Sequence, residues 1–234
     1  MIDLAEVEYA LNLEQGSPEW LAFKCGKVSA SRIADITARL RNGDPAASRL
    51  TYMGQLIAER LTGVPAETYS NAAMEWGRLW EPVARAAYQF ERLCTVEQVG
   101  IVLHPEIPGS LASPDGLIGD DGLVEIKCPQ TGTHIETVLS RTIPGRYQQQ
   151  MQWQLACTGR SWCDFVSYDP RMPEHMRIWI KRLERDAQRI SQLELEVASF
   201  LDDMVERIRD LQNVYEADTS ALACSAGQPV HVAL

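Results

Sequence analysis

The stretch Gly119-Asp120-Asp121-Gly122 constrains this chain most strongly, because it joins two short apolar runs through a tight turn. Glycines and aspartates supply the backbone conformations that a β-hairpin turn requires. The segments on either side, within 111–129, are therefore predicted to be the two arms of a hairpin. A chain with such a hairpin near its middle needs a sheet around it.

The second arm of the hairpin alternates between charged and apolar residues. Side chains two positions apart on a strand share a face, so Glu125 and Lys127 are predicted to point the same way. The opposite face carries the residues expected to pack in the core, which are Val124, Ile126 and Cys128.

The first arm brings a second carboxylate, Asp115, across from Glu125. Two converging carboxylates repel each other, and burying either charge unpaired costs several kcal/mol. A divalent cation removes that penalty, and oxygen ligands favour Mg²⁺ or Mn²⁺ over zinc. The backbone carbonyl of Ile126 is a further candidate ligand.

Lys127 fits phosphodiester hydrolysis better than it fits metal ligation or core packing. A lysine beside a metal can orient the attacking water or stabilise the negative charge that develops on a phosphate. The alternative is that Glu125 and Lys127 form an ordinary ion pair on the sheet surface and Asp115 belongs to a turn.

Helical patterns flank the hairpin on both sides. Helices are expected at 17–25, 29–40, 49–61, 71–93 with an interruption at Pro82, 133–139, 147–158 and 186–214. Further extended segments are expected at 95–105, 163–168 and 176–180. Helices first, then a small mixed sheet with helices on it, then a long closing helix, indicate an α/β sandwich.

The length of 234 residues suits one domain, expected over 1–216, with a fraying tail at 217–234. The six cysteines form no paired pattern, the N-terminus does not resemble a signal peptide, and no run is long enough to span a membrane, which together favour a soluble cytoplasmic protein.

The net charge of −10 argues against a protein that coats nucleic acid generally, but the charge is uneven. Residues 20–50 carry six bases and two acids, whereas 183–218 carry four bases and ten acids. A polyanion site would therefore use the first part of the chain.

Asp115, Glu125 and Lys127 match the PD-(D/E)xK nuclease motif, with Pro114 completing it. The chain resembles the phage lambda exonuclease and YqaJ-like viral recombinase family in particular. Five blocks in the family's order carry this resemblance over roughly residues 15–182: WLAFKCGKVSAS, WGRLWE, SPDGL with EIKCP, YQQQMQWQ and YDPRM. The resemblance implies a restriction-endonuclease-like core with a small twisted mixed sheet flanked by helices.

The resemblance also implies roles for the residues of the site. Asp115 and Glu125 would hold two Mg²⁺ ions, for which Mn²⁺ can substitute, with Asp115 bridging them and Lys127 positioning the attacking water. Glu81 corresponds to the family's helix glutamate and Gln152 to its active-site glutamine. Gln150 is the rival for the glutamine position.

The family's site for a terminal 5'-phosphate corresponds to Lys24, Ser31 and Ser113. Lys24 departs from the pattern, because arginine occupies this place in the family and lysine lacks its two-pronged donor geometry. Recognition of the 5'-phosphate is therefore expected either to be weaker than in the family or to use Lys27 or Arg32 as well.

By resemblance, the chain is a Mg²⁺-dependent deoxyribonuclease that digests duplex DNA from 5' ends. It would release mononucleotides and leave 3' overhangs for recombination by a single-strand annealing protein. A homo-oligomeric, trimeric ring around DNA is implied, in the host cytoplasm if a phage encodes the chain. Two alternatives remain open: an endonuclease with the same site, and a non-catalytic DNA-end-binding scaffold.

Overall fold

The computed structural model describes residues 4–66 and 72–226, and a four-stranded mixed sheet forms its centre. The strands lie in the order β4 (Gly116–Ile118), β5 (Gly122–Lys127), β6 (Trp162–Tyr168) and β7 (Ile178–Glu184). β4 and β5 are antiparallel and joined by the predicted turn, β5 and β6 are parallel, and β6 and β7 are antiparallel. The hairpin prediction is confirmed.

A second, three-stranded sheet consists of β1 (Val28–Ser29), β3 (Ser110–Ala112) and β2 (Val102–Leu103), in that order. Its central strand β3 is followed after three residues by β4 of the larger sheet. The segment 113–115, which contains the PD half of the motif, therefore connects the two sheets.

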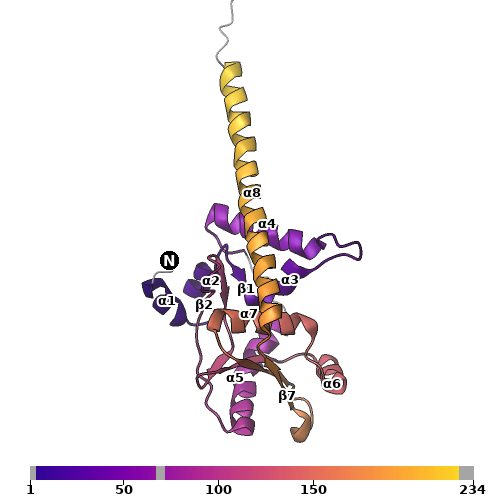
Figure 1. Cartoon of the computed structure of the whole chain (residues 1–234). Coiled ribbons are helices and arrows are strands. Elements are labelled where there is room, and N and C mark those ends of the chain that lie inside the picture. The colour runs from indigo at the N-terminus through magenta and orange to yellow at the C-terminus, as the bar shows by residue number, and fades with distance from the viewer. Residues whose placement is uncertain (1–3, 67–71, 227–234) are drawn as a thin grey trace, which may run out of the picture.

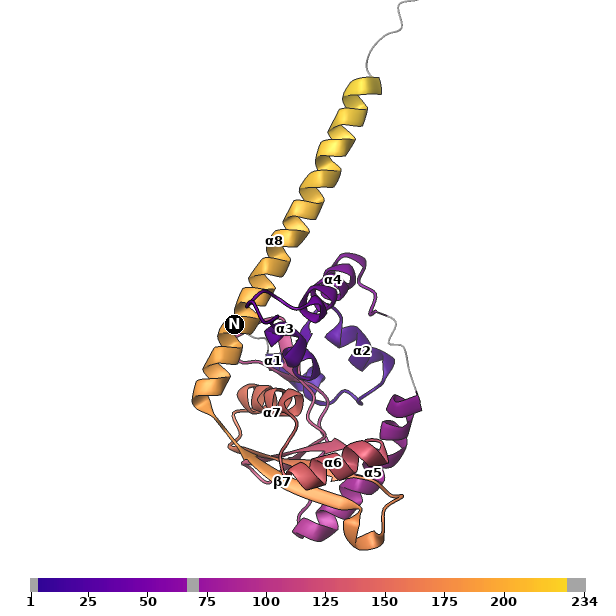
Figure 2. The same ribbon diagram turned by 90° about the vertical axis from the view of Figure 1, so that its right-hand side faces the viewer.

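Helices surround both sheets (Figures 1 and 2). They are α1 (Leu4–Leu11), α2 (Pro18–Lys24), α3 (Ile33–Thr37), α4 (Ala47–Thr62), α5 (Ala72–Arg92), α6 (Thr131–Ser140), α7 (Gly145–Thr158) and α8 (Ala187–Ala226), with short 3₁₀ turns η1 (Ala30–Arg32) and η2 (Glu174–Met176). α7 lies between the N-terminal helices and the larger sheet (Figure 2).

The two faces of the larger sheet have different cover. Val124 and Ile126 of β5 pack with Tyr88 of α5 on one face, whereas Leu123 packs with Met151 of α7 on the other. This division follows the alternation of a strand, and it places Glu125 and Lys127 on the α7 face.

α5 runs as one helix through Pro82, where an interruption was expected. Proline removes the hydrogen bond to the carbonyl four residues earlier, that of Arg78. Both Pro82 and Arg78 are exposed, so water can bond this carbonyl. The buried face of the helix, which includes Ala84 and Tyr88, is undisturbed.

α8 is longer than expected, because it continues past residue 214 to Ala226. Its first half packs on the body through Leu193, Val197, Phe200 and Met204, and its second half projects away from the body (Figure 1). The predicted tail thus begins as helix, and 227–234 lie outside the described residues.

The expected fold class is confirmed, with two small mixed sheets in place of one. The described helices include none that combines the length and apolarity required to cross a membrane.

Candidate active site

Asp115 lies directly before β4, where the hairpin places it beside β5. Its Oδ2 accepts a hydrogen bond of 2.6 Å from the backbone N–H of Ile126. Burial raises the pKa of this carboxyl well above its usual range, and the charges of Glu125 and Glu81 raise it further, against the opposing effect of Lys127. The predicted convergence of carboxylates is therefore present.

Glu125 is fully buried on the α7 face of β5. Its Oε1 accepts hydrogen bonds from Lys127 and, at 2.7 Å, from Nε2 of Gln150, while Oε2 accepts one of 2.6 Å from Nε2 of Gln154. Three donors thus hold the carboxylate in one orientation.

Lys127 connects this buried cluster to solvent, since 29% of its side chain is exposed. Burial alone would lower its pKa, but the charges of Glu125 and Asp115 outweigh that effect and raise it. The neighbouring carboxylates therefore favour the protonated ammonium. It also lies 5.3 Å from the ring centre of Tyr147.

Glu81 lies on α5 and is close enough to Asp115, Glu125 and Lys127 to interact with their charges. Burial raises its pKa, Arg85 and Lys127 lower it, and Glu125 raises it. Its carboxylate forms an ion pair with Arg85, one turn further along the helix. The continuous helix through Pro82 thus still brings Glu81 near the site.

The free acceptor positions of these carboxylates test whether the site suits a divalent ion. A carboxylate has about four acceptor positions, of which Glu125 uses three and Asp115 one. Acceptor capacity remains on both, and their mutual repulsion favours a cation, so the oxygen donors fit Mg²⁺. Within the described residues, no preformed group of three or more Asp, Glu, His or Cys ligands is present.

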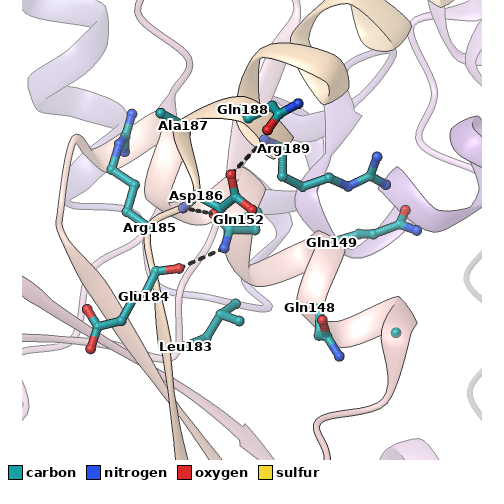
Figure 3. Close-up of a pocket in the computed structure, with 11 residues that line it drawn as sticks. Gln148, Gln149, Gln152, Leu183, Glu184, Arg185, Asp186, Ala187, Gln188 and Arg189 are labelled. Atoms are coloured by element: carbon teal, nitrogen blue, oxygen red, sulfur yellow. Dashed lines mark hydrogen bonds between the residues drawn. The ribbon is translucent and has the colours of Figure 1, made fainter.

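Gln152 is not part of this cluster, which corrects the prediction for the active-site glutamine. Its Nε2 donates to the carbonyl of Glu184 at 2.8 Å, and its Oε1 accepts from the N–H of Asp186 at 3.1 Å. It lines an open pocket of about 840 Å³ between α7 and the start of α8 (Figure 3). Gln150, the rival candidate, contacts Glu125 instead.

The error came from treating α7 as a helix with one buried stripe. All residues from 150 to 157 are buried, because α7 packs against the sheet on one side and against α3 and α8 on others. On a helix that is buried on several sides, a residue at the border of the apolar stripe is no closer to the active site than its neighbours. The useful signal was the spacing of Gln150 and Gln154, which puts both amides on one face.

The two serines predicted to bind phosphate lie at the same end of the smaller sheet. Ser31 follows β1 and Ser113 follows β3, and these two strands are parallel neighbours. Ser31 is exposed and 3.2 Å from the hydroxyl of Ser29, whereas the Oγ of Ser113 is buried with no hydrogen-bond partner among the described residues. Ser113 also lies two positions before Asp115 in the chain.

The three predicted bases differ in availability. Lys24 lies over the ring of Trp20, at 3.7 Å from its centre. Lys27 turns back onto α2 and donates to the carbonyl of Phe23 at 2.7 Å. Arg32 forms a 2.5 Å ion pair with Asp35, so only Lys24 lacks a hydrogen-bonded acceptor within the described part of the chain.

A family description, YqaJ-like viral recombinase domain, matches residues 19–161. Among solved structures, an alkaline exonuclease from Laribacter hongkongensis (LHK-Exo) is 48% identical, with a TM-score of 0.80, over 86% of this chain and 99% of that one. Its complex with dAMP gives a TM-score of 0.81 at the same identity and coverage.

A phage-related exonuclease from Haemophilus somnus 129PT is 16% identical, with a TM-score of 0.65 over 79% of this chain and 96% of that one, which indicates a shared fold. A comparison with curated proteins found no match.

Proposed function

Because the chain belongs to the family of YqaJ-like viral recombinase domains, we propose that it is an exonuclease that acts on ends of double-stranded DNA in recombination. The observation that carries this proposal is the convergence of Asp115 and Lys127 on the buried carboxylate of Glu125. The dAMP complex of the 48% identical relative supports mononucleotide products.

Asp115 and Glu125, with the carbonyl of Ile126, would hold the divalent ions, Mg²⁺ with Mn²⁺ as a substitute and two in number. When bound, these ions would lower the pKa of a water molecule and neutralise charge on the scissile phosphate. Glu81 would support the same ions from α5.

Lys127 would act as a fixed positive charge during hydrolysis. Its raised pKa favours the protonated form, which donates hydrogen bonds. Placed beside Glu125, it would hold the attacking water and stabilise the negative charge that develops on the phosphate oxygens. Gln150 and Gln154 would keep Glu125 oriented throughout.

Direction of digestion would come from the end-binding pocket. Ser31, Ser113 and Lys24 offer two hydroxyls and an ammonium, a donor set that suits a terminal phosphate. We propose that 5'-phosphorylated ends enter here, which gives 5'-to-3' digestion and a 3' overhang for an annealing protein. We also propose that three copies of the chain form a ring and that this ring acts in the cytoplasm.

Linear and closed circular duplexes of the same sequence test the proposal. With Mg²⁺ present, the linear form with 5'-phosphates is expected to lose one strand from each 5' end, and the circle is expected to stay intact. Products are resolved by strand on a denaturing gel. Cutting of the circle at a comparable rate would identify an endonuclease, and binding of ends without hydrolysis would identify a scaffold.

The two glutamines of α7 give a paired prediction. Gln150→Ala is expected to lower the digestion rate by about 10- to 100-fold, because groups that orient a metal ligand typically have effects of that size. Gln152→Ala is expected to leave the rate near wild type but to lower the free energy of unfolding by about 1–2 kcal/mol, since it leaves backbone groups of Glu184 and Asp186 unpaired.

Initial rates and denaturant unfolding curves of both variants provide the measurement. A reversed pattern, with activity lost only in Gln152→Ala, would restore the original assignment of the active-site glutamine.

A further inference from the structure

The loop that follows α2 is hydrogen-bonded to the C-terminal part of α4. Gly26 lies between Lys24 and β1, with φ of +69°, in the left-handed region. Its N–H donates to Oε2 of Glu59 at 2.7 Å, and its carbonyl accepts from Nε of Arg60 at 2.8 Å. Two consecutive residues of α4 thus hold both polar groups of one glycine.

Glu59 is buried, and its carboxylate accepts two hydrogen bonds besides the one from Gly26. Oε1 accepts from Nε2 of Gln55 at 2.9 Å and from the N–H of Ala66 at 3.1 Å. The backbone carbonyl of Glu59 also accepts from the thiol of Cys25 at 3.6 Å. Among the described residues, no side-chain cation is hydrogen-bonded to this carboxylate. Burying its charge costs desolvation energy, so a nearby positive charge is expected to balance it.

Lys24 is the candidate for that balancing charge. Burial lowers the pKa of Lys24 to about 8, and the negative charge of Glu59 opposes this effect. α4 also contacts the backbone at Ser29, because the hydroxyl of Tyr52 accepts a hydrogen bond of 3.2 Å from the N–H of Ser29. α4 therefore fixes the backbone from 25 to 29 that separates Lys24 from Ser31.

We propose that Glu59 and Arg60 are positioning residues for the DNA end: by holding Gly26, they aim Lys24 and Ser31 at the terminal 5'-phosphate. This inference rests on the proposed function, because it concerns the placement of the phosphate-binding groups. Neither Glu59 nor Arg60 needs to touch DNA.

The contacts of Glu59 and Arg60 with this loop require glycine at position 26. A Cβ at this position would lie 2.6 Å from Cγ of Arg60, and the positive φ disfavours any other residue. Gly26→Ala therefore displaces the loop without changing a charge. Glu59→Ala removes the acceptor, and Glu59→Gln keeps one acceptor oxygen while removing the charge.

The test compares linear duplexes with 5'-phosphate and 5'-hydroxyl ends in Mg²⁺, using KM and kcat for each. Wild type is expected to prefer the phosphorylated end. In Glu59→Ala and Gly26→Ala, KM for that end is expected to rise about tenfold and the preference to approach one, with kcat within about threefold of wild type. Glu59→Gln is expected to lie between wild type and Glu59→Ala.

Arg49→Met is the matched control, since Arg49 lies on the same helix as Glu59. The substitution removes the 2.7 Å ion pair between Arg49 and Asp203 of α8. It is expected to lower thermal stability and keep the end preference. If wild type shows the preference and the Glu59 and Gly26 variants keep it, the positioning role is wrong while the exonuclease stands. If wild type itself has no preference for a 5'-phosphate, the proposed end pocket fails.

Discussion

The Lys127→Met variant is expected to lose hydrolysis of duplex DNA by about a hundredfold or more, since removing one group that stabilises transition-state charge typically costs that much. Methionine keeps much of the length of lysine and removes the charge. Glu125 keeps its hydrogen bonds from Gln150 and Gln154, so the native fold is expected to persist. The measurement is the single-turnover rate at saturating Mg²⁺.

The same substitution has a cost in stability, because it leaves the fully buried charge of Glu125 without its cation. A loss of about 3 kcal/mol is expected from breaking such a pair. The double variant Glu125→Gln/Lys127→Met removes both charges and is expected to recover most of that loss while staying inactive. Stability and catalysis can thus be separated.

Lys181→Met serves as the control for the loss of a lysine from the same sheet. Lys181 lies on β7, two strands from Glu125 in the sheet, and donates to the carbonyl of Arg141. Its activity is expected to match wild type. Digestion by Lys127→Met within a few-fold of wild type would contradict the catalytic role of Lys127 and favour the scaffold alternative.

The hairpin could be predicted because its signals are local. The turn 119–122, the alternation around Glu125 and the reach of Asp115 across two antiparallel arms depend on neighbours within about ten residues. Such local rules predicted the hairpin that brings Asp115 beside β5. The resemblance then pointed to Glu81, which periodicity alone would have left as one more exposed helix acid.

What could not be predicted depends on contacts between distant segments. β1 has two residues and exists because it pairs with β3, some eighty positions away. The choice between Gln150 and Gln152 depended on α7 being buried on several sides, which its own sequence does not reveal. Likewise, the clamp of α4 on Gly26 joins residues more than thirty positions apart.

The carboxylate pair leads to a second prediction, in which loss of function accompanies a gain in stability. Asp115 is half-buried beside Glu125 and Glu81, and the raised pKa reflects an unfavourable charge in the metal-free protein. Asp115→Asn removes this charge, and the amide oxygen can still accept from the N–H of Ile126. In EDTA, the variant is therefore expected to melt at a higher temperature than wild type.

Divalent ions are expected to reverse this order. An ion that binds only the folded state at a hundred times its Kd stabilises that state by about 2.7 kcal/mol. Wild type is expected to gain thermal stability as Mg²⁺ or Mn²⁺ is added, and Asp115→Asn is expected to respond little. Its hydrolysis is expected to fall by about a thousandfold, because the variant lacks a principal ligand.

Asp164→Asn supplies the control, because Asp164 is a fully buried carboxylate whose charge is compensated by hydrogen-bond donors. It accepts hydrogen bonds from Arg182 at 2.8 and 3.0 Å and from Tyr88 at 2.8 Å. Loss of its charge weakens the hydrogen bonds from Arg182 and Tyr88, so this variant is expected to melt at a lower temperature with or without metal. The melting temperatures of the three proteins are measured by differential scanning calorimetry. Asp115 would be a structural acid, and not a metal ligand, if Asp115→Asn melts below wild type in EDTA. The same conclusion would follow if Mg²⁺ raises the melting temperature of the variant as much as that of wild type.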